Sequence, residues 1–170
     1  MRYTPEYMAL MERESPHLVE HLRYLEVLSE ESDRGVVLVT ASMLEDVLER
    51  LLLARLVEGR EAEKLLTGFG APLGTFSAKI AAARAVGVIS EQWRRELDLL
   101  RDIRNRLAHE VTVTLGDGPI LNKCNELCLC LSDRATDAAG ARKRYWMSAT
   151  AILIDSLHAL HEGKITRIDG

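Results

Sequence analysis

The residues with the clearest chemical potential lie in one short stretch, RDIRNRLAHE, at positions 101–110. Histidine exchanges protons near neutral pH, arginine binds phosphates through a fixed fork of donors, and asparagine can orient either group. Arg104, Asn105 and His109 could therefore cleave RNA without a metal. In that reaction the 2′-hydroxyl attacks its own phosphate, histidine handles a proton, and arginine stabilises the developing charge.

The same residues also have a structural explanation. Arg104 follows Leu97 by seven residues, so on a helix it lies on or beside the apolar stripe. A buried, unpaired guanidinium is costly, and Arg104 would then need a carboxylate partner. His109 would only cap the end of the helix. The expected partners of Arg104 are Glu45, Asp46 and Glu49, with Asp33 as a more remote choice.

The spacing of these residues bears on both explanations. Arg101, Asn105 and His109 are four residues apart and share one helix face. Arg104 and His109 are five apart, which places them about 140° apart around a regular helix. They would converge only if the helix loosens at residues 108–109, an ending that the β-branched run after that point favours.

Helical periodicity extends over nearly the whole chain, with apolar residues recurring every three or four positions. We expect a single all-α domain over residues 1–170, an antiparallel bundle of four main helices plus short extra helices. The helix over 33–58 is apolar on most sides and should be central. The predicted helices cover residues 17–30, 33–58, 76–86, 91–108, 120–131 and 141–162. Residues 1–14 form a short N-terminal segment that could be a separate, shorter helix.

Residues 68–74, GFGAPLG, interrupt this pattern, because three glycines and a proline forbid regular structure. The segment lacks the Gly-Lys-Ser/Thr ending of a phosphate-binding loop, and no strand precedes it. We therefore predict a tight loop between helices, with Phe69 and Leu73 tucked beneath it. Residues suited to helix ends flank the predicted helices: Ser15, Pro16, Gly59, Thr75, Ser77 and Ser90.

Composition narrows the classes of partner. The chain is 47% hydrophobic and 28% charged, with a net charge of −4, which is typical of a globular protein and gives no case for binding bulk nucleic acid. The densest basic run, residues 141–144, is expected to be a solvated helix start. No helix-turn-helix with a basic recognition helix is evident, so we expect no direct DNA binding. We also expect a cytoplasmic location without a membrane segment, since no apolar run could cross a bilayer.

Metal and cofactor sites are not indicated. Cys124, Cys128 and Cys130 form an odd cluster that fits neither a disulfide framework nor a four-ligand zinc site, so we expect buried free thiols. Two histidine pairs at helical spacing, 17/21 and 158/161, lack the added carboxylate of a metalloprotease helix. We predict no metal and no cofactor.

Parts of the sequence resemble two known protein families. Residues 104–109, RNRLAH, resemble the R-x4-6-H motif of HEPN domains, including their common Arg-Asn opening. A longer ordered set looks like the mannitol operon repressor family, in a block from about residue 30 to residue 112. That set comprises SDRG (32–35), LEDVL (44–48), GFGAPLGTFSAKI (68–80), GVIS (87–90) and RDIRNRLAH (101–109).

The resemblances imply two functions. Mannitol operon repressors are implied to be all-helical regulators that lack a standard DNA-binding motif, so this chain is expected to repress transcription through an unidentified protein partner. HEPN domains are helical bundles, often dimeric, which implies a homodimer. Many are metal-independent ribonucleases with arginine and histidine in a cleft at the dimer interface. The alternative expectation is therefore an endoribonuclease with Arg104, Asn105 and His109 as its catalytic residues and RNA as its substrate.

Overall fold

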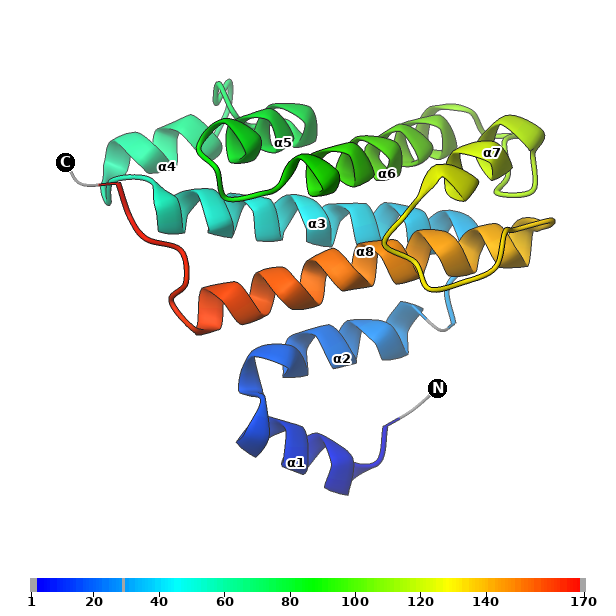
Figure 1. Cartoon of the computed structure of the whole chain (residues 1–170), viewed down its shortest axis with the longest axis horizontal. Helices are drawn as coiled ribbons and strands as arrows, with labels where there is room; N and C mark the ends of the chain where they lie inside the picture. Colours follow the sequence, from blue (N-terminus) through cyan, green and yellow to red (C-terminus); the bar gives the residue numbers. More distant parts are fainter. Residues whose placement is uncertain (1–2, 29, 169–170) are drawn as a thin grey trace.

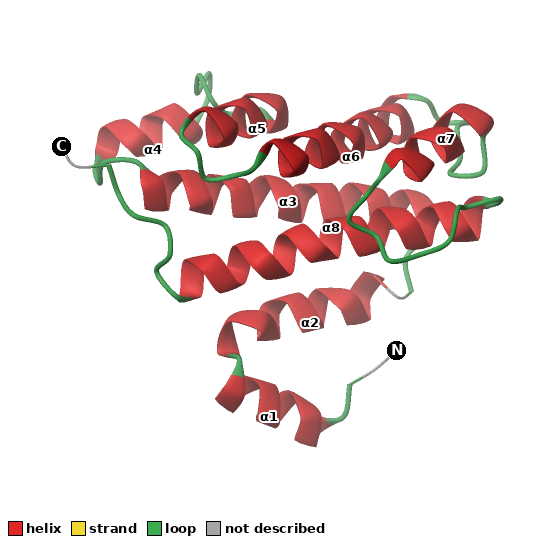
Figure 2. Ribbon diagram, viewed as in Figure 1, coloured by secondary structure: helices red, strands yellow, loops and turns green. Residues whose placement is uncertain are grey.

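The computed structural model describes residues 3–28 and 30–168, and within them it contains eight helices and no strand (Figures 1 and 2). The all-α helical bundle predicted from the sequence is thereby confirmed. The helices are α1 (Pro5–Glu14), α2 (Pro16–Leu28), α3 (Asp33–Arg55), α4 (Arg60–Leu66), α5 (Phe76–Ala85), α6 (Glu91–His109), α7 (Gly118–Glu126) and α8 (Ala138–His161).

The four longest helices, α2, α3, α6 and α8, alternate in direction along the chain (Figure 1). The central helix α3 packs against α5 and α6 on one side and against α2 and α8 on the other. As expected for a helix that is apolar all round, α3 has a buried core row that includes Leu44, Leu48 and Leu52. The core continues into α6 through Leu97, Leu100, Ile103 and Leu107.

Helix boundaries follow local chemistry where a capping residue is present. The hydroxyl of Thr75 accepts from the N–H of Ala78 at the start of α5, and that of Ser90 accepts from the N–H of Trp93 at the start of α6. The predicted end of α3 at Glu58 is too late, because the helix ends at Arg55. Gly59, at φ +148°, instead begins α4, a helix that the periodicity did not reveal.

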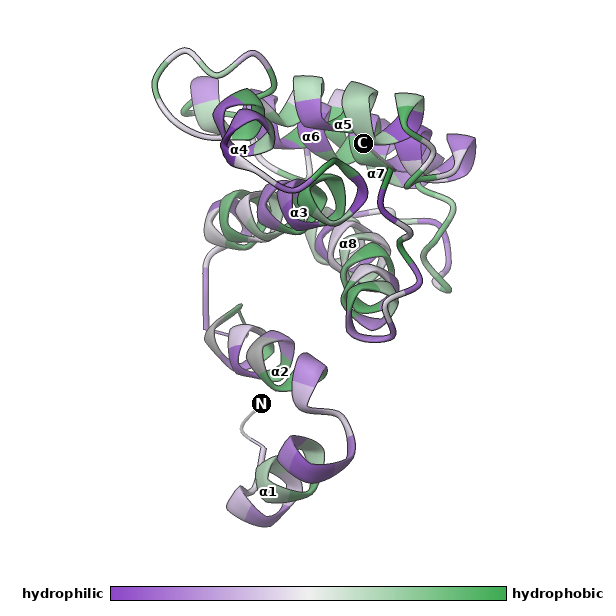
Figure 3. Cartoon of the chain, turned by 90° about the vertical axis from the view of Figure 1, so that its left-hand side faces the viewer, coloured by the Kyte–Doolittle hydropathy of each residue, from purple (hydrophilic) through white to green (hydrophobic). Residues whose placement is uncertain are grey.

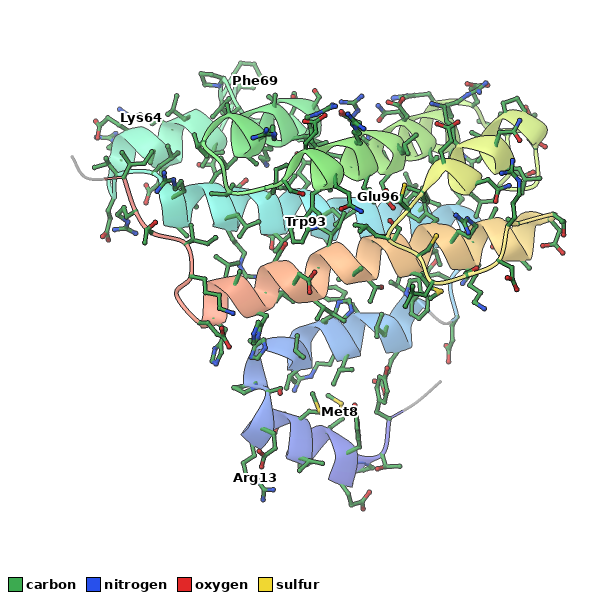
Figure 4. All side chains as sticks on the ribbon, in the orientation of Figure 1. Met8, Arg13, Lys64, Phe69, Trp93 and Glu96 are labelled. Carbon is green, nitrogen blue, oxygen red and sulfur yellow. The ribbon has the colours of Figure 1, made fainter. Side chains whose placement is uncertain are left out.

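The loop over 68–74 is present as predicted, but only one of its two apolar side chains packs. Leu73 lies against the core, and its N–H donates to the carbonyl of Leu65. Phe69 is fully exposed and projects from the loop, so the prediction that it tucks beneath the loop is wrong (Figure 4). With positive φ at Gly68 and Gly70 on either side of it, the tight turn carries Phe69 outward.

The two N-terminal helices lie to one side of the bundle. α1 has no buried residue and packs on α2, which in turn packs on α8 and α3. The view in Figure 3 again places α1 beyond α2, away from the other helices. An ion pair of Arg23 with Glu12, at 3.3 Å, joins the two helices. Within residues 3–28 and 30–168, no helix combines the length and apolar character needed to cross a membrane.

Candidate functional site

A polar pocket of about 290 Å³ opens between α3, α5 and α6. We call it the α3–α5–α6 pocket. Three chain segments that are far apart in the sequence form it: one glutamate of α3, the first residues around the start of α5, and one face of α6. Its lining residues are Glu45, Thr75, Phe76, Ser77, Arg101, Arg104 and Asn105.

Helix α5 is fixed beside this pocket by a lysine that the sequence analysis did not single out. Lys79 is 5% exposed, and its Nζ lies 3.4 Å from Glu45 and 2.7 Å from Glu49 on α3. Burial disfavours the charged ammonium, but the hydrogen bonds and charges of the two glutamates outweigh burial and raise the pKa of Lys79. The ion pairs of Lys79 with Glu45 and Glu49 therefore hold α5 against α3, and the two glutamates compensate the charge of the buried lysine.

The predicted ion pairs of Arg104 are not formed. Its Nη1 donates to Oδ1 of Asn105 at 2.9 Å, and within the part of the chain that is described no carboxylate pairs with it. Glu45 and Glu49 are instead paired with Lys79 of α5, a cation that the sequence analysis did not consider. Arg104 is half-buried and so keeps access to solvent through the pocket instead of lying sealed in the core.

The other two acidic residues proposed as partners also bind elsewhere. Asp46 lies 3.9 Å from Arg50 one turn along α3, and Asp33 lies 2.9 Å from Arg142 on α8. Arg142 further donates to the carbonyl oxygens of Glu31 and Leu28 just before α3. The expectation of a solvated basic run at 141–144 is therefore wrong for this arginine, which anchors the connection into α3, and also for Arg144, which is buried.

His109 stands apart from Arg104. Helix α6 continues without a break through His109, so the loosening at residues 108–109 that would bring the two side chains together does not occur. The imidazole is exposed, does not line the α3–α5–α6 pocket, and has no hydrogen bond or ion pair within residues 3–28 and 30–168. In a single chain, the two residues therefore lie on different faces, about 140° apart for a regular helix.

An arginine that the sequence analysis did not single out, Arg34 of α3, fixes the end of α6. Nη2 of Arg34 donates to the carbonyls of Glu110, Val111 and Val113 at 3.1, 2.9 and 2.9 Å. These oxygens follow the last turn of α6, where helical partners run out. Arg34 lies in the SDRG segment, which therefore has a structural role in holding the chain next to His109.

Arg101 contributes a compensated charge to the pocket. It pairs with Asp98 and Asp102, each at 2.9 Å, and Asp102 also meets Lys123 at 3.2 Å. Burial alone would raise the pKa of Asp102, but hydrogen bonds from Arg101 and Lys123 lower it below its usual value. Of the two arginines that line the pocket, Arg104 is thus the one without a carboxylate.

Buried polar side chains behind α6 have a structural role. Glu96, 1% exposed, accepts from the N–H groups of Cys128 and Leu129, both at 2.9 Å, and from the hydroxyl of Ser148 (Figure 4). Arg144, 7% exposed, donates to the carbonyl oxygens of Cys124 in α7 and of Leu127 and Ser132 in the segment that follows. Neither side chain faces the α3–α5–α6 pocket. Both hold the irregular connection that leads into α8.

The cysteines divide by burial. Cys124 and Cys130 are buried free thiols, as predicted, whereas Cys128 is exposed. Burial raises the pKa of Cys124 to about 12 and also raises that of Cys130. Both thiols therefore stay protonated near neutral pH, so neither forms the reactive thiolate. Within residues 3–28 and 30–168, no group of three or more histidine, cysteine, aspartate or glutamate side chains is arranged to hold a metal ion.

The chain matched no protein-family model, no curated protein and no solved structure.

Proposed function

We propose that this chain is a transcriptional regulator of the mannitol-operon-repressor type that acts by binding a protein partner, without binding DNA itself. One observation carries the proposal. Every residue that lines the α3–α5–α6 pocket comes from a segment that resembles that family, namely 44–48, 68–80 or 101–109. Three segments that lie apart in the sequence thus meet at one surface, which makes that surface the natural place for recognition.

The chemistry of the pocket favours an acidic group on the partner. A guanidinium has five N–H donors, and Arg104 directs one of them to Asn105. The N-terminus of α5 opens onto the same pocket, and first-turn N–H groups lack partners within a helix and attract negative charge. A carboxylate of the partner would therefore meet Arg104, with the hydroxyl of Ser77 beside it.

A metal-independent ribonuclease is the second candidate, and one observation favours it. Arg104 is open to solvent without a carboxylate partner, and His109 is exposed with no partner in the described chain. Because α6 is unbroken, the two residues can share a cleft only if they come from different copies, with Arg104 of one chain facing His109 of another. This alternative therefore requires a homodimer, whereas the regulator does not.

The regulator is tested by capturing partners from cells that naturally express the chain. Wild type and Arg106→Ala are compared with Arg104→Ala; Arg106 lies on the same helix, pairs with Glu110 and does not line the pocket. We expect one protein to be captured by wild type and Arg106→Ala but lost with Arg104→Ala. We also expect transcripts of the regulated operon to rise in cells that carry only Arg104→Ala. Equal capture and equal transcript levels for all three would contradict the proposal.

The ribonuclease is tested separately, with purified protein and RNA in EDTA. Cleavage that disappears in His109→Ala and in Arg104→Ala, but not in Arg106→Ala, would establish the alternative. Mixing the two inactive variants offers a sharper test, because a mixed dimer restores one intact Arg104–His109 pair. RNA that stays intact after prolonged incubation with wild type removes this candidate.

A further inference from the structure

A second, chemically different pocket lies on the opposite side of α3, between α2, α3 and α8. We call it the α2–α3–α8 pocket. Its volume is about 260 Å³, and its walls are mainly apolar, formed by Val39, Met43 and Val47 of α3 and by Leu153 and Leu157 of α8. It shares no residue with the α3–α5–α6 pocket. Asp46 and Val47 belong to the 44–48 segment, but the pocket's other lining residues lie outside the segments that resemble the mannitol operon repressor family.

His21 of α2 lines this pocket and is its most informative residue. The side chain is 3% exposed, and neither ring nitrogen has a hydrogen-bond partner in the described chain. Burial lowers the pKa of His21, so the ring is neutral near pH 7 and offers one donor and one acceptor. Buried polar groups are nearly always hydrogen-bonded, and an unsatisfied one costs about 1–3 kcal/mol. Both nitrogens of this ring are buried and unbonded, and the ring lines a pocket, so a polar group bound there could supply the missing hydrogen bond once the ring turns toward it.

The pocket's dimensions and charge restrict what can bind. An apolar cavity of roughly 150 Å³ holds one benzene ring, so 260 Å³ has room for a molecule somewhat larger, about the size of a fused two-ring system. Asp46 and Arg50 lie at the pocket with their charges directed to each other, 3.9 Å apart, and both side chains are well exposed. The buried interior thus provides hydrogen bonding through His21 but no counter-charge for an ionic ligand.

We propose that the α2–α3–α8 pocket binds a small, uncharged, planar aromatic molecule that hydrogen-bonds to His21 through a ring N–H or a hydroxyl. The apolar walls hold the ring, and the imidazole selects for the polar atom. Helix α2 covers the bound molecule, which would tighten the packing of α2 on α3 and α8. This inference is independent of the proposed regulatory function, because it concerns another pocket and other residues.

The test uses indole as the probe and indene, its hydrocarbon counterpart of the same shape, as the matched ligand. Binding to the full chain is measured by calorimetry and by ligand-observed NMR. We expect indole to bind wild type at least tenfold more tightly than indene does. His21→Leu should abolish that difference, and Val39→Trp, which fills the pocket, should abolish binding of both. His109→Phe makes a similar histidine replacement on α6, outside the pocket, and should change neither affinity.

The structure of the complex provides the direct measurement. A crystal structure with indole should place the ring between Met43 and Leu157 with its N–H donated to His21. Thermal unfolding shows whether each variant is folded. A loss of binding is interpreted only for variants that fold. The proposal is overturned if indole does not bind folded wild type at millimolar concentration, if indene binds equally well, or if only water occupies the pocket.

Discussion

In the described part of the chain, buried polar groups are hydrogen-bonded or ion-paired on one side of α3 and lack partners on the other side. On the side of α5, α6 and α7, Lys79, Glu96 and Arg144 are all buried, and each is bonded to carboxylates, backbone N–H groups or carbonyls. Around α2 and the end of α8 the described buried polar groups lack partners. These are His21, Thr40 on α3 and Ser156 on α8.

This difference distinguishes polar groups that hold the fold together from those that are open to a ligand. A fully bonded buried group stabilises one arrangement of helices, and deleting it leaves its partners unsatisfied. An unbonded buried group costs free energy in the folded state, so its removal is neutral or stabilising. Opposite signs of mutational effect on the two sides of α3 would establish the distinction.

The largest effect is expected for Glu96→Ala. The substitution leaves the N–H groups of Cys128 and Leu129 and the hydroxyl of Ser148 without their acceptor. We expect a loss of about 3 kcal/mol in the free energy of unfolding, measured by urea denaturation. Glu61→Ala, on an exposed position of α4, is the control and should change it by less than about 0.5 kcal/mol. Similar values for both variants would argue against a structural role for Glu96.

Lys79→Met should have the next largest effect. It keeps the length of the side chain but leaves Glu45 and Glu49 facing each other without a cation. Both glutamates are about a quarter exposed, so solvent relieves part of the cost. We expect a loss of about 2 kcal/mol by urea denaturation. The triple variant with both glutamates changed to glutamine should recover most of it, and failure to recover would mean that Lys79 acts through packing alone.

Acid should destabilise the α2 side, by less than either substitution. Burial lowers the pKa of His21. Burial and the charges of His161 and His158 lower the pKa of His17, and the charge of Glu162 partly offsets this effect. Folded-state pKa values below the unfolded value of about 6.5 mean that the unfolded chain binds more protons in acid. Stability should therefore fall as the pH drops from 8 to 5.

The control for this pH effect is the double variant His17→Phe/His21→Leu. Exposed carboxylates contribute equally to the wild type and the variant, so the difference between their pH profiles isolates the two histidines. The charged groups near them, Asp46 and Arg50 at the pocket and Glu162 just after α8, are retained in both proteins. Parallel profiles from pH 8 to pH 5 would show that neither histidine has a lowered pKa in the folded protein.

His21→Leu should stabilise the protein. Leucine has a similar size and removes two polar atoms that have no partner within the described chain. We expect a gain of about 1 kcal/mol in urea denaturation at pH 8, where the imidazole is neutral in both states. His109→Leu, at an exposed site, should shift stability by no more than about 0.5 kcal/mol. A clear loss of stability with His21→Leu would mean that the ring is already bonded in the free protein.

Arg104→Ala should have the smallest effect on stability. Because Lys79 already neutralises Glu45 and Glu49, removal of Arg104 leaves no carboxylate unpaired. The expected loss is below about 1 kcal/mol in urea denaturation. The same variant is expected to lose partner binding, so it separates function from folding. A loss of 3 kcal/mol or more would indicate that Arg104 holds the bundle together.

Local chemistry in the sequence was sufficient for most of the helices. Apolar residues at helical spacing, with Thr75 and Ser90 as caps, place α5 and α6 within a residue or so of their observed ends. Helix α4 was missed because seven residues are too few for a clear period. The connection around α7 was predicted as a longer helix, but α7 ends at Glu126, where Glu96 binds the N–H groups that follow.

The sequence by itself determined that this is a helical bundle and that residues 101–109 lie at the end of one of its helices, whereas the structure decided that this helix runs unbroken through His109 and so keeps Arg104 and His109 out of phase. Only the tertiary structure decided which cation meets which carboxylate, because the choice depends on how α5 packs on α3. In the folded protein Glu45 and Glu49 pair with Lys79, and Arg104 lines a pocket without a carboxylate partner in the described chain. Arg34 bonds to the carbonyls at the end of α6. Periodicity fixes the face of a helix on which a side chain lies, whereas packing between distant segments fixes its partner.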